Sequence, residues 1–259
     1  MPGLLPHVDP DGLLEYSVVY TDRALNHMSR RFQRVMQDVS ATLKSVYGAR
    51  SAIVVPGSGS FGMESVARQF ATGKNVLVIR NGWFSYRWSQ IFEMGAIPAR
   101  TQVLKARTTG PGPQAPFAPA PIAEVVATIR ETKPDLVFAP HVETAAGLML
   151  PHDYLRAVAA AVHEHGGLFV LDCVASGSIW VDMPETGVDI IVGAPQKGWS
   201  STPCSITSSW PFTRRPPSTC LPCPISRSIF TTSGIKLKSG SPLPNWMTRF
   251  ASWRGQSAR

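Results

Sequence analysis

The sequence predicts an α/β fold built on a mostly parallel β-sheet with helices on both faces. Short apolar runs such as 51–55 and 75–79 alternate with longer amphipathic segments of helical periodicity. Runs such as 168–171 are apolar throughout, which is typical of strands that are buried on both faces. Alternating strands and helices indicate βαβ units, whose strands are parallel.

The first half of the chain is expected to open with a long amphipathic helix over residues 21–47. Its apolar residues recur at three- and four-residue steps, and Gly48 follows as a stop signal. Apolar runs and Gly-marked helical segments then predict further elements. The expected strands are 51–55, 75–79 and 97–104, and the expected helices are 63–71 and 83–94.

The second half is expected to start with a loop over 107–121, because Pro and Gly dominate this stretch. A helix should follow at 121–132, and another at 152–166 with His152 or Asp153 as its N-cap. The remaining apolar runs predict strands at 135–139, 168–172 and 189–192.

Composition divides the chain into an N-terminal segment (1–20), a large domain (21–205) and a tail (206–259). The tail has eight Lys or Arg, seven Pro, ten Ser and no acidic residue. Removing these eight cations leaves 17 Lys or Arg in 1–205, equal to the 17 acidic residues of the chain, so the net charge of +8 belongs to the tail. We expect the tail to be frame-shifted, or else a disordered segment.

Several functional classes are disfavoured by the same composition. A neutral body does not suggest a nucleic-acid-binding protein. No apolar run of membrane-spanning length and no signal peptide is apparent, and four cysteines without a disulfide framework indicate a cytoplasmic protein. Cys220 and Cys223 form a lone CxxC without a second pair, so no metal site is expected.

A glycine-rich turn, GSGSFG at 57–62, follows the first expected strand. It can be a simple strand-to-helix turn, or a cup in which backbone amides at a helix N-terminus bind an anion. A dinucleotide site is a further reading. That site would use Arg80 for a 2′-phosphate, since no acidic residue ends the next strand.

Asp172 and Lys197 end two later strands of the same expected sheet. A buried carboxylate needs a cationic or hydrogen-bonding partner, whereas either residue alone could be an ordinary surface group. Ligands bind at the carboxyl ends of such strands. An anion cup, a carboxylate and a partly desolvated lysine suit the phosphate, ring nitrogen and aldehyde of pyridoxal phosphate.

Five motifs in series carry a family resemblance. They are GSGS at 57–60, NGWFSYR at 81–87, HVETAAG at 141–147, LDCVAS at 171–176 and GAPQKGW at 193–199. Together they resemble the class V aminotransferases, which are fold-type I pyridoxal-phosphate enzymes. The likeness is greatest to the serine–pyruvate and alanine–glyoxylate aminotransferases, and it covers roughly residues 7–205.

The resemblance implies a role for each matching residue. Lys197 would form the Schiff base, and Asp172 would pair with the ring nitrogen. Phe84 would stack on the ring, with its neighbour Trp83 a weaker candidate, while Val174 would pack on the opposite face. The remaining cofactor contacts would come from Ser58, Gly59, Ser60 and Gln196 at the phosphate and from Thr144 near the ring hydroxyl.

Three histidine and glutamate positions near these motifs are assigned no catalytic role. His27 lies in a segment that shapes the substrate entrance in the family, and one polar position on a helix does not establish that role here. His141 and Glu143 flank Thr144 and are expected to be structural.

The implied activity is transfer of an amino group between a small amino acid and a 2-oxo acid by a homodimer. The family continues beyond the lysine into a small domain with a substrate-binding arginine, and residues 206–259 do not match it. We therefore expect a missing or replaced small domain, a poorly covered sheet after 205, and weak or impaired activity. The alternatives are a lyase, desulfurase or racemase of the same fold, an NADP-dependent oxidoreductase, and a basic-tailed binding protein.

Overall fold

A seven-stranded sheet forms the centre of the protein in a computed structural model that describes residues 30–55, 57–199 and 205–209. The strand order is β1-β11-β10-β9-β6-β2-β3, and every neighbouring pair is parallel except the two that involve β11. The strands are β1 (Ser51–Val55), β2 (Asn75–Arg80), β3 (Arg100–Lys105), β6 (Leu136–Pro140), β9 (Leu168–Asp172), β10 (Ile190–Gly193) and β11 (Ser205–Ser209). The predicted fold class, a mostly parallel α/β sheet, is confirmed.

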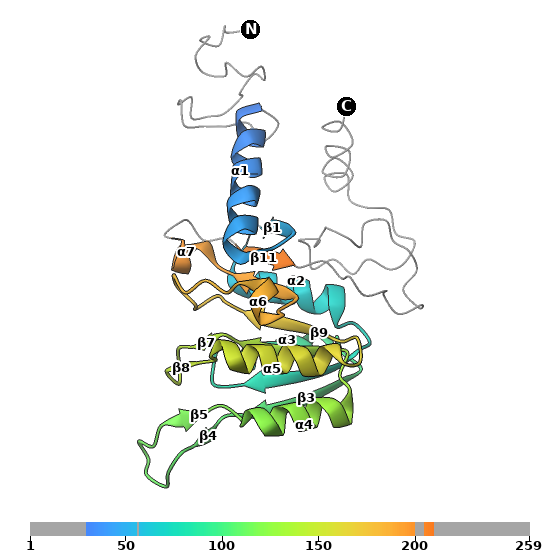
Figure 1. Cartoon of the computed structure of the whole chain (residues 1–259), viewed down its shortest axis with the longest axis vertical. Coiled ribbons are helices and arrows are strands. Elements are labelled where there is room, and N and C mark those ends of the chain that lie inside the picture. The colour runs from blue at the N-terminus through green and yellow to red at the C-terminus, as the bar shows by residue number, and fades with distance from the viewer. Residues whose placement is uncertain (1–29, 56, 200–204, 210–259) are drawn as a thin grey trace, which may run out of the picture.

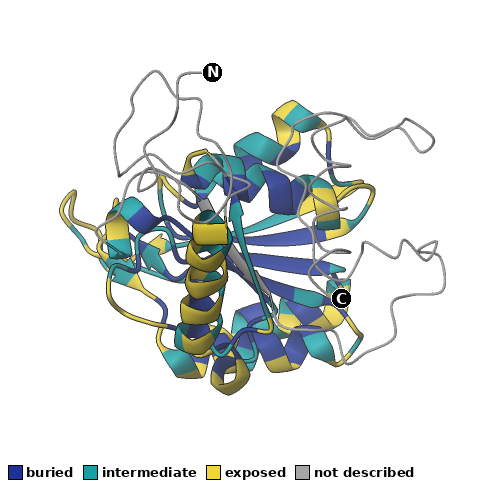
Figure 2. Cartoon of the chain, turned by 90° about the horizontal axis from the view of Figure 1, so that it is seen from above, coloured by how far each residue is buried: buried dark blue, intermediate teal, exposed yellow. Residues whose placement is uncertain are grey.

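Helices cover both faces of this sheet, as Figure 2 shows. Side chains alternate across a strand, so β2 sends Val76 and Val78 to one face and Leu77 and Ile79 to the other. The first face packs against α2 (Gly59–Phe70) and α3 (Tyr86–Gly95). The second packs against α4 (Ile122–Thr132), α5 (His152–His163) and the end of α1 (Arg30–Tyr47).

Helix α1 extends from one end of the molecule, and a small hairpin extends from the other (Figure 1). The hairpin joins β4 (Arg107–Thr108) to β5 (Phe117–Ala118) within the stretch that we predicted to be a loop. The first residues of the expected long helix, 21–29, lie outside the described residues, as do 1–20 and 210–259. The division of the chain into three segments therefore stays a prediction.

Two helix starts and one N-cap differ from the prediction. Helix α2 begins at Gly59 and so includes Gly62, which we had placed before the helix. The N-cap of α5 is Pro151, in an extended conformation, rather than His152 or Asp153. Helix α3 begins at Tyr86 because the preceding residues form a separate turn.

Short elements add to the predicted set. They are the β7–β8 hairpin (Val142–Glu143 with Leu148–Met149), α6 (Met183–Thr186) and α7 (Pro195–Gly198).

Strand β11 lies inside the sheet, and this corrects the expectation that the edge of the sheet is poorly covered after residue 205. It pairs antiparallel with β1 on one side and with β10 on the other. The prediction failed because the serine-rich segment 205–209 lacks an apolar run, whereas pairing on both sides uses backbone groups that every residue possesses.

Candidate functional site

The carboxyl ends of β1, β2, β6, β9 and β10 meet at one edge of the sheet, because these strands run in the same direction. Pro140 and Val192 are both in register with Asp172, so β6, β9 and β10 end close to one level. Ligands of parallel α/β sheets bind at this edge. Each of the five motifs that carry the family resemblance lies there.

The turn between β1 and α2 presents the first amides of a helix toward this edge. Ser58 is the N-cap of α2 in an extended conformation, and its side chain makes no capping hydrogen bond. The amides in the first turn of a helix have no partner within the helix, so those of Gly59 and Ser60 are donors for an anion. A side chain at Gly59 would place its Cβ 2.9 Å from Val174 Cγ2, so glycine lets the two loops meet.

Asp172 is the last residue of β9, and only 7% of its surface is exposed. Its Oδ1 accepts a hydrogen bond of 2.9 Å from the Val174 amide. Burial raises the pKa of Asp172 from its ordinary value of 3.8 to about 6. The Val174 amide opposes this rise, Glu143 adds to it, and the cations of Lys197 and Arg87 lower the pKa.

Lys197 lies in the single helical turn α7, directly after β10. Its Nζ lies 5.4 Å from the centroid of the Phe84 ring. The expected partial desolvation is wrong for this single chain, because Lys197 is exposed and no segment within the described ranges covers it. Beside it, the Gln196 side-chain oxygen is buried and has no hydrogen-bond partner among the described residues.

Phe84 belongs to a turn between β2 and α3 that is bound to Glu143. The two Glu143 carboxylate oxygens accept hydrogen bonds from the Phe84 amide (3.0 Å) and the Ser85 amide (2.8 Å). The Ser85 hydroxyl donates a further bond of 2.6 Å. Phe84 is 41% exposed and Trp83 63% exposed, and it is Phe84 that faces Lys197.

The β7–β8 turn carries Thr144, which is exposed at the same edge. Its neighbour His141 is buried, and the His141 Nδ1 lies 2.8 Å from the Ser176 hydroxyl. Burial, with a smaller contribution from His152, lowers the pKa of His141 from 6.5 to about 4. These contacts agree with the structural role that we expected for His141.

Arg87 is a member of the site that the sequence analysis did not single out. Its guanidinium donates a hydrogen bond to the Ser60 hydroxyl, and its charge acts on Asp172. The signal was available, since Arg87 ends the motif NGWFSYR. The structure therefore places a cation beside the expected phosphate cup.

Arg80, the residue of the NADP alternative, is engaged elsewhere. Its guanidinium carbon lies 4.8 Å from the centroid of the Tyr86 ring, and it donates a 3.5 Å hydrogen bond to the Ser89 hydroxyl. His27 and the CxxC of the tail lie outside the described residues.

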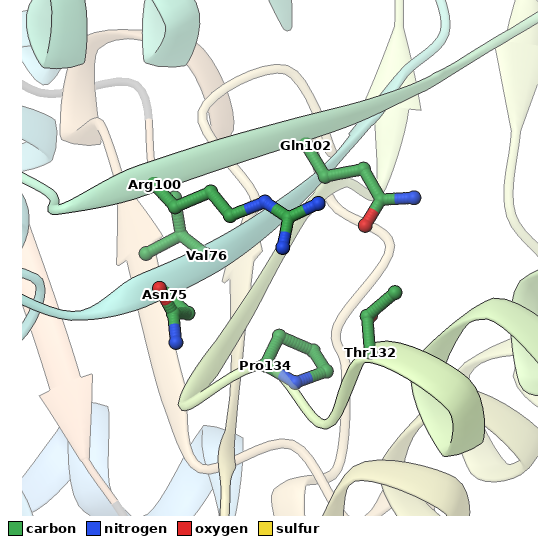
Figure 3. Close-up of a pocket in the computed structure, with 6 residues that line it drawn as sticks. All are labelled: Asn75, Val76, Arg100, Gln102, Thr132 and Pro134. Atoms are coloured by element: carbon green, nitrogen blue, oxygen red, sulfur yellow. The ribbon is translucent and has the colours of Figure 1, made fainter.

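The other edge of the sheet holds a small hollow, which Figure 3 shows at the starts of β2 and β3. It is lined by Asn75, Val76, Arg100, Gln102, Thr132 and Pro134. Because this edge is opposite the carboxyl ends, the hollow is separate from the candidate site.

Within the described ranges, no three His, Cys, Asp or Glu side chains gather as a metal site requires. None of the described helices combines the length and apolar character that crossing a bilayer requires.

The residues present fit a pyridoxal-phosphate site by the chemistry of their polar groups. A buried carboxylate, an amine next to an aromatic ring and the free amides of a helix N-terminus lie at one edge of the sheet. These groups suit a ring nitrogen, an aldehyde and a phosphate, respectively.

Comparison with known proteins agrees with this geometry. The sequence profile described as Aminotransferase class-V matches residues 13–203, which is more than half of the chain. The small subunit of a soluble hydrogenase from Synechococcus is 27% identical over 183 residues, 69% of this chain and 45% of that protein. Rat alanine–glyoxylate aminotransferase is 28% identical over 186 residues, 70% of this chain and 42% of that protein.

A solved structure shows the same fold. Ureidoglycine–glyoxylate aminotransferase from Bacillus subtilis matches with a TM-score of 0.61 and 22% identity, over 72% of this chain and 46% of that one. This chain spans less than half the length of the two sequence relatives. The profile match across the five motifs shows that the protein belongs to the class V aminotransferase family.

Proposed function

We propose that this chain is the cofactor-binding part of a pyridoxal-phosphate-dependent aminotransferase. It would transfer an amino group between a small amino acid and a 2-oxo acid, in the alanine or serine to glyoxylate or pyruvate class. The observation that carries the proposal is the presence of the buried Asp172 carboxylate and the Lys197 amine at the sheet edge where α2 begins. The relatives named for glyoxylate aminotransfer support the substrate class.

The proposed cofactor contacts follow the site geometry. The phosphate would be held by the amides of Gly59 and Ser60, the hydroxyls of Ser58 and Ser60, and Gln196. Arg87 adds positive charge there. Phe84 and Val174 would cover the two faces of the ring, and Thr144 would bond near its hydroxyl.

Two residues would perform the proton chemistry. Pyridoxal phosphate supplies an electron-accepting ring that stabilises negative charge at the substrate α-carbon. Lys197 would anchor the aldehyde through its Nζ. Once displaced by the substrate amine, the same nitrogen would take the proton from the substrate α-carbon and deliver it to the C4′ carbon of the cofactor. Ionised Asp172 would keep a proton on the ring nitrogen, and that positive charge would in turn favour the ionised form of the Asp172 carboxyl group.

The proposal extends to features that the family resemblance implies. We infer a cytoplasmic homodimer, in which a second subunit would cover Lys197, and a cofactor affinity that is weak in this chain. We also propose that the tail, residues 206–259, stands in place of the family's small domain.

Titration with pyridoxal phosphate tests the proposal. The protein should develop the visible absorbance of cofactor bonded to lysine, and Lys197→Ala should abolish it. An unchanged spectrum in Lys197→Ala would exclude Lys197 as the anchor. Because activity is expected to be weak, incubation of the loaded protein with alanine and glyoxylate should yield pyruvate and glycine only slowly. Formation of alanine from cysteine, with sulfide released when a thiol reductant is added, would instead identify a desulfurase.

A further inference from the structure

We propose that Glu143 is a positioning residue that holds the Phe84 ring beside the Lys197 amine by binding the turn between β2 and α3. The contact itself is independent of the proposed function, whereas its consequence for cofactor binding rests on that function. Phe84 and Glu143 are 59 positions apart in the chain, so the contact joins two separate strand ends.

Glu143 contributes both carboxylate oxygens to this contact. Oε1 accepts a bond from the Phe84 amide, and Oε2 accepts bonds from the amide and hydroxyl of Ser85. A longer bond of 3.4 Å joins the Ala145 amide to Oε1. Hydrogen bonds to an ionised acceptor are stronger than neutral ones, so this set can define the turn.

The Glu143 side chain is completely buried, with 0% of its surface exposed. The described residues place no Lys or Arg in an ion pair with it, so the donors of the turn are its stabilising partners. A carboxylate buried without such donors is costly. The turn and the carboxylate therefore depend on each other.

Close backbone approach reinforces the same contact. A Cβ atom at Gly82 would lie 2.7 Å from Glu143 Cγ and 2.8 Å from Cδ. The turn thus lies directly on the Glu143 side chain, and glycine makes this possible. Ser85 strengthens the turn from within, because its hydroxyl also accepts a hydrogen bond from the Asn81 amide.

The position of Glu143 links this turn to the rest of the site. Glu143 ends β7 immediately before Thr144, while Phe84, on the bound turn, faces Lys197 at 5.4 Å. The Glu143 charge also contributes to the raised pKa of Asp172. One buried side chain therefore acts on three residues that are expected to contact the cofactor.

Amide hydrogen exchange in cofactor-free protein tests the contact. In Glu143→Gln, an amide NH₂ replaces one acceptor, so exchange of the Phe84 and Ser85 amides should accelerate about tenfold. The matched control is Asp189→Asn. Asp189 accepts a hydrogen bond from the Phe169 amide at the opposite edge of the sheet. Weakening of that bond should leave the turn between β2 and α3 unchanged.

The position of the ring is tested without cofactor by magnetic resonance. Labelled methyl groups placed on Lys197 by reductive methylation, and assigned with Lys197→Arg, should be shifted by the Phe84 ring. Phe84→Ala should abolish this shift, and Glu143→Gln should reduce it. Asp189→Asn should preserve it.

A double-mutant cycle on pyridoxal-phosphate affinity separates positioning from general destabilisation. If Glu143 acts through Phe84, Glu143→Gln should weaken binding about tenfold in the wild type but much less in Phe84→Ala. Unchanged exchange of the turn, an unchanged ring shift or fully additive losses of affinity would each overturn the proposal. If the wild type binds no cofactor, the proposed function fails, and the exchange and resonance measurements alone decide the role of Glu143.

Discussion

The Lys197 Nζ lies 5.4 Å from the centroid of the Phe84 ring, although Lys197 follows strand β10 and Phe84 follows strand β2, which are not neighbours in the sheet. A cation near the face of an aromatic ring is attracted by its quadrupole. The arrangement also places the flat apolar ring of Phe84 next to the Lys197 amine, which the motifs mark as the reactive one.

Replacement of the ring should affect cofactor binding rather than folding. Phe84→Ala removes a side chain that is 41% exposed, so little burial is lost, and pyridoxal-phosphate affinity should fall by about 1–2 kcal/mol. Trp83→Ala is the control, because Trp83 packs near Tyr86 instead, with ring centroids 6.1 Å apart. Absorbance titration measures both, and an equal loss in the two variants would contradict the assignment of the ring to Phe84.

Asp172→Asn should stabilise the cofactor-free protein at neutral pH. The folded carboxyl group has a pKa of about 6 against an ordinary 3.8, so the folded state holds more protons between these values. Wild-type stability therefore falls as pH rises through this window, by about 1–3 kcal/mol. Denaturant unfolding should show the variant to be more stable at pH 8, with the difference disappearing below pH 4.

The opposite pH dependence is expected from His141. Its pKa is lowered to about 4, so the unfolded state binds the proton more tightly and stability is lost as pH falls from 6.5 toward 4. His141→Asn removes this loss, which amounts to about 2–3 kcal/mol. The unfolding free energy should differ less between pH 7 and pH 4 in the variant than in the wild type. An equal difference in the two proteins would refute the burial argument.

Gly59→Ala tests the contact between the β1–α2 turn and the loop after β9. The new Cβ would lie 2.9 Å from Val174 Cγ2, closer than ordinary van der Waals contact, so a loss of about 1–3 kcal/mol is expected. Val174→Ala in the same chain should restore part of it. Gly112→Ala is the control, because no atom lies within 4 Å of its added Cβ. Thermal unfolding of the wild type and the three variants gives the comparison.

Sequence patterns predicted the central strands well, because apolar runs such as β9 and β10 exist only where both faces are buried. They failed for β11, whose place depends on backbone pairing with distant strands, and for the two-residue strands of β4–β5 and β7–β8, which are too short for a period. The residues at the strand ends could be placed together because parallel strands end at the same edge of the sheet, whichever residues they contain. The Glu143 contacts were missed, since they join segments that no local pattern connects.

The position of β11 also has a consequence for biosynthesis. Strand β1 is made early, yet among the described strands its partner is β11, which leaves the ribosome about 150 residues later. Until then β1 lacks the strand that joins it to the sheet, and the helix start at Ser58 that follows it lacks that support. The helix start that the proposed phosphate contact uses therefore gains this support only after the lysine and the carboxylate have been translated.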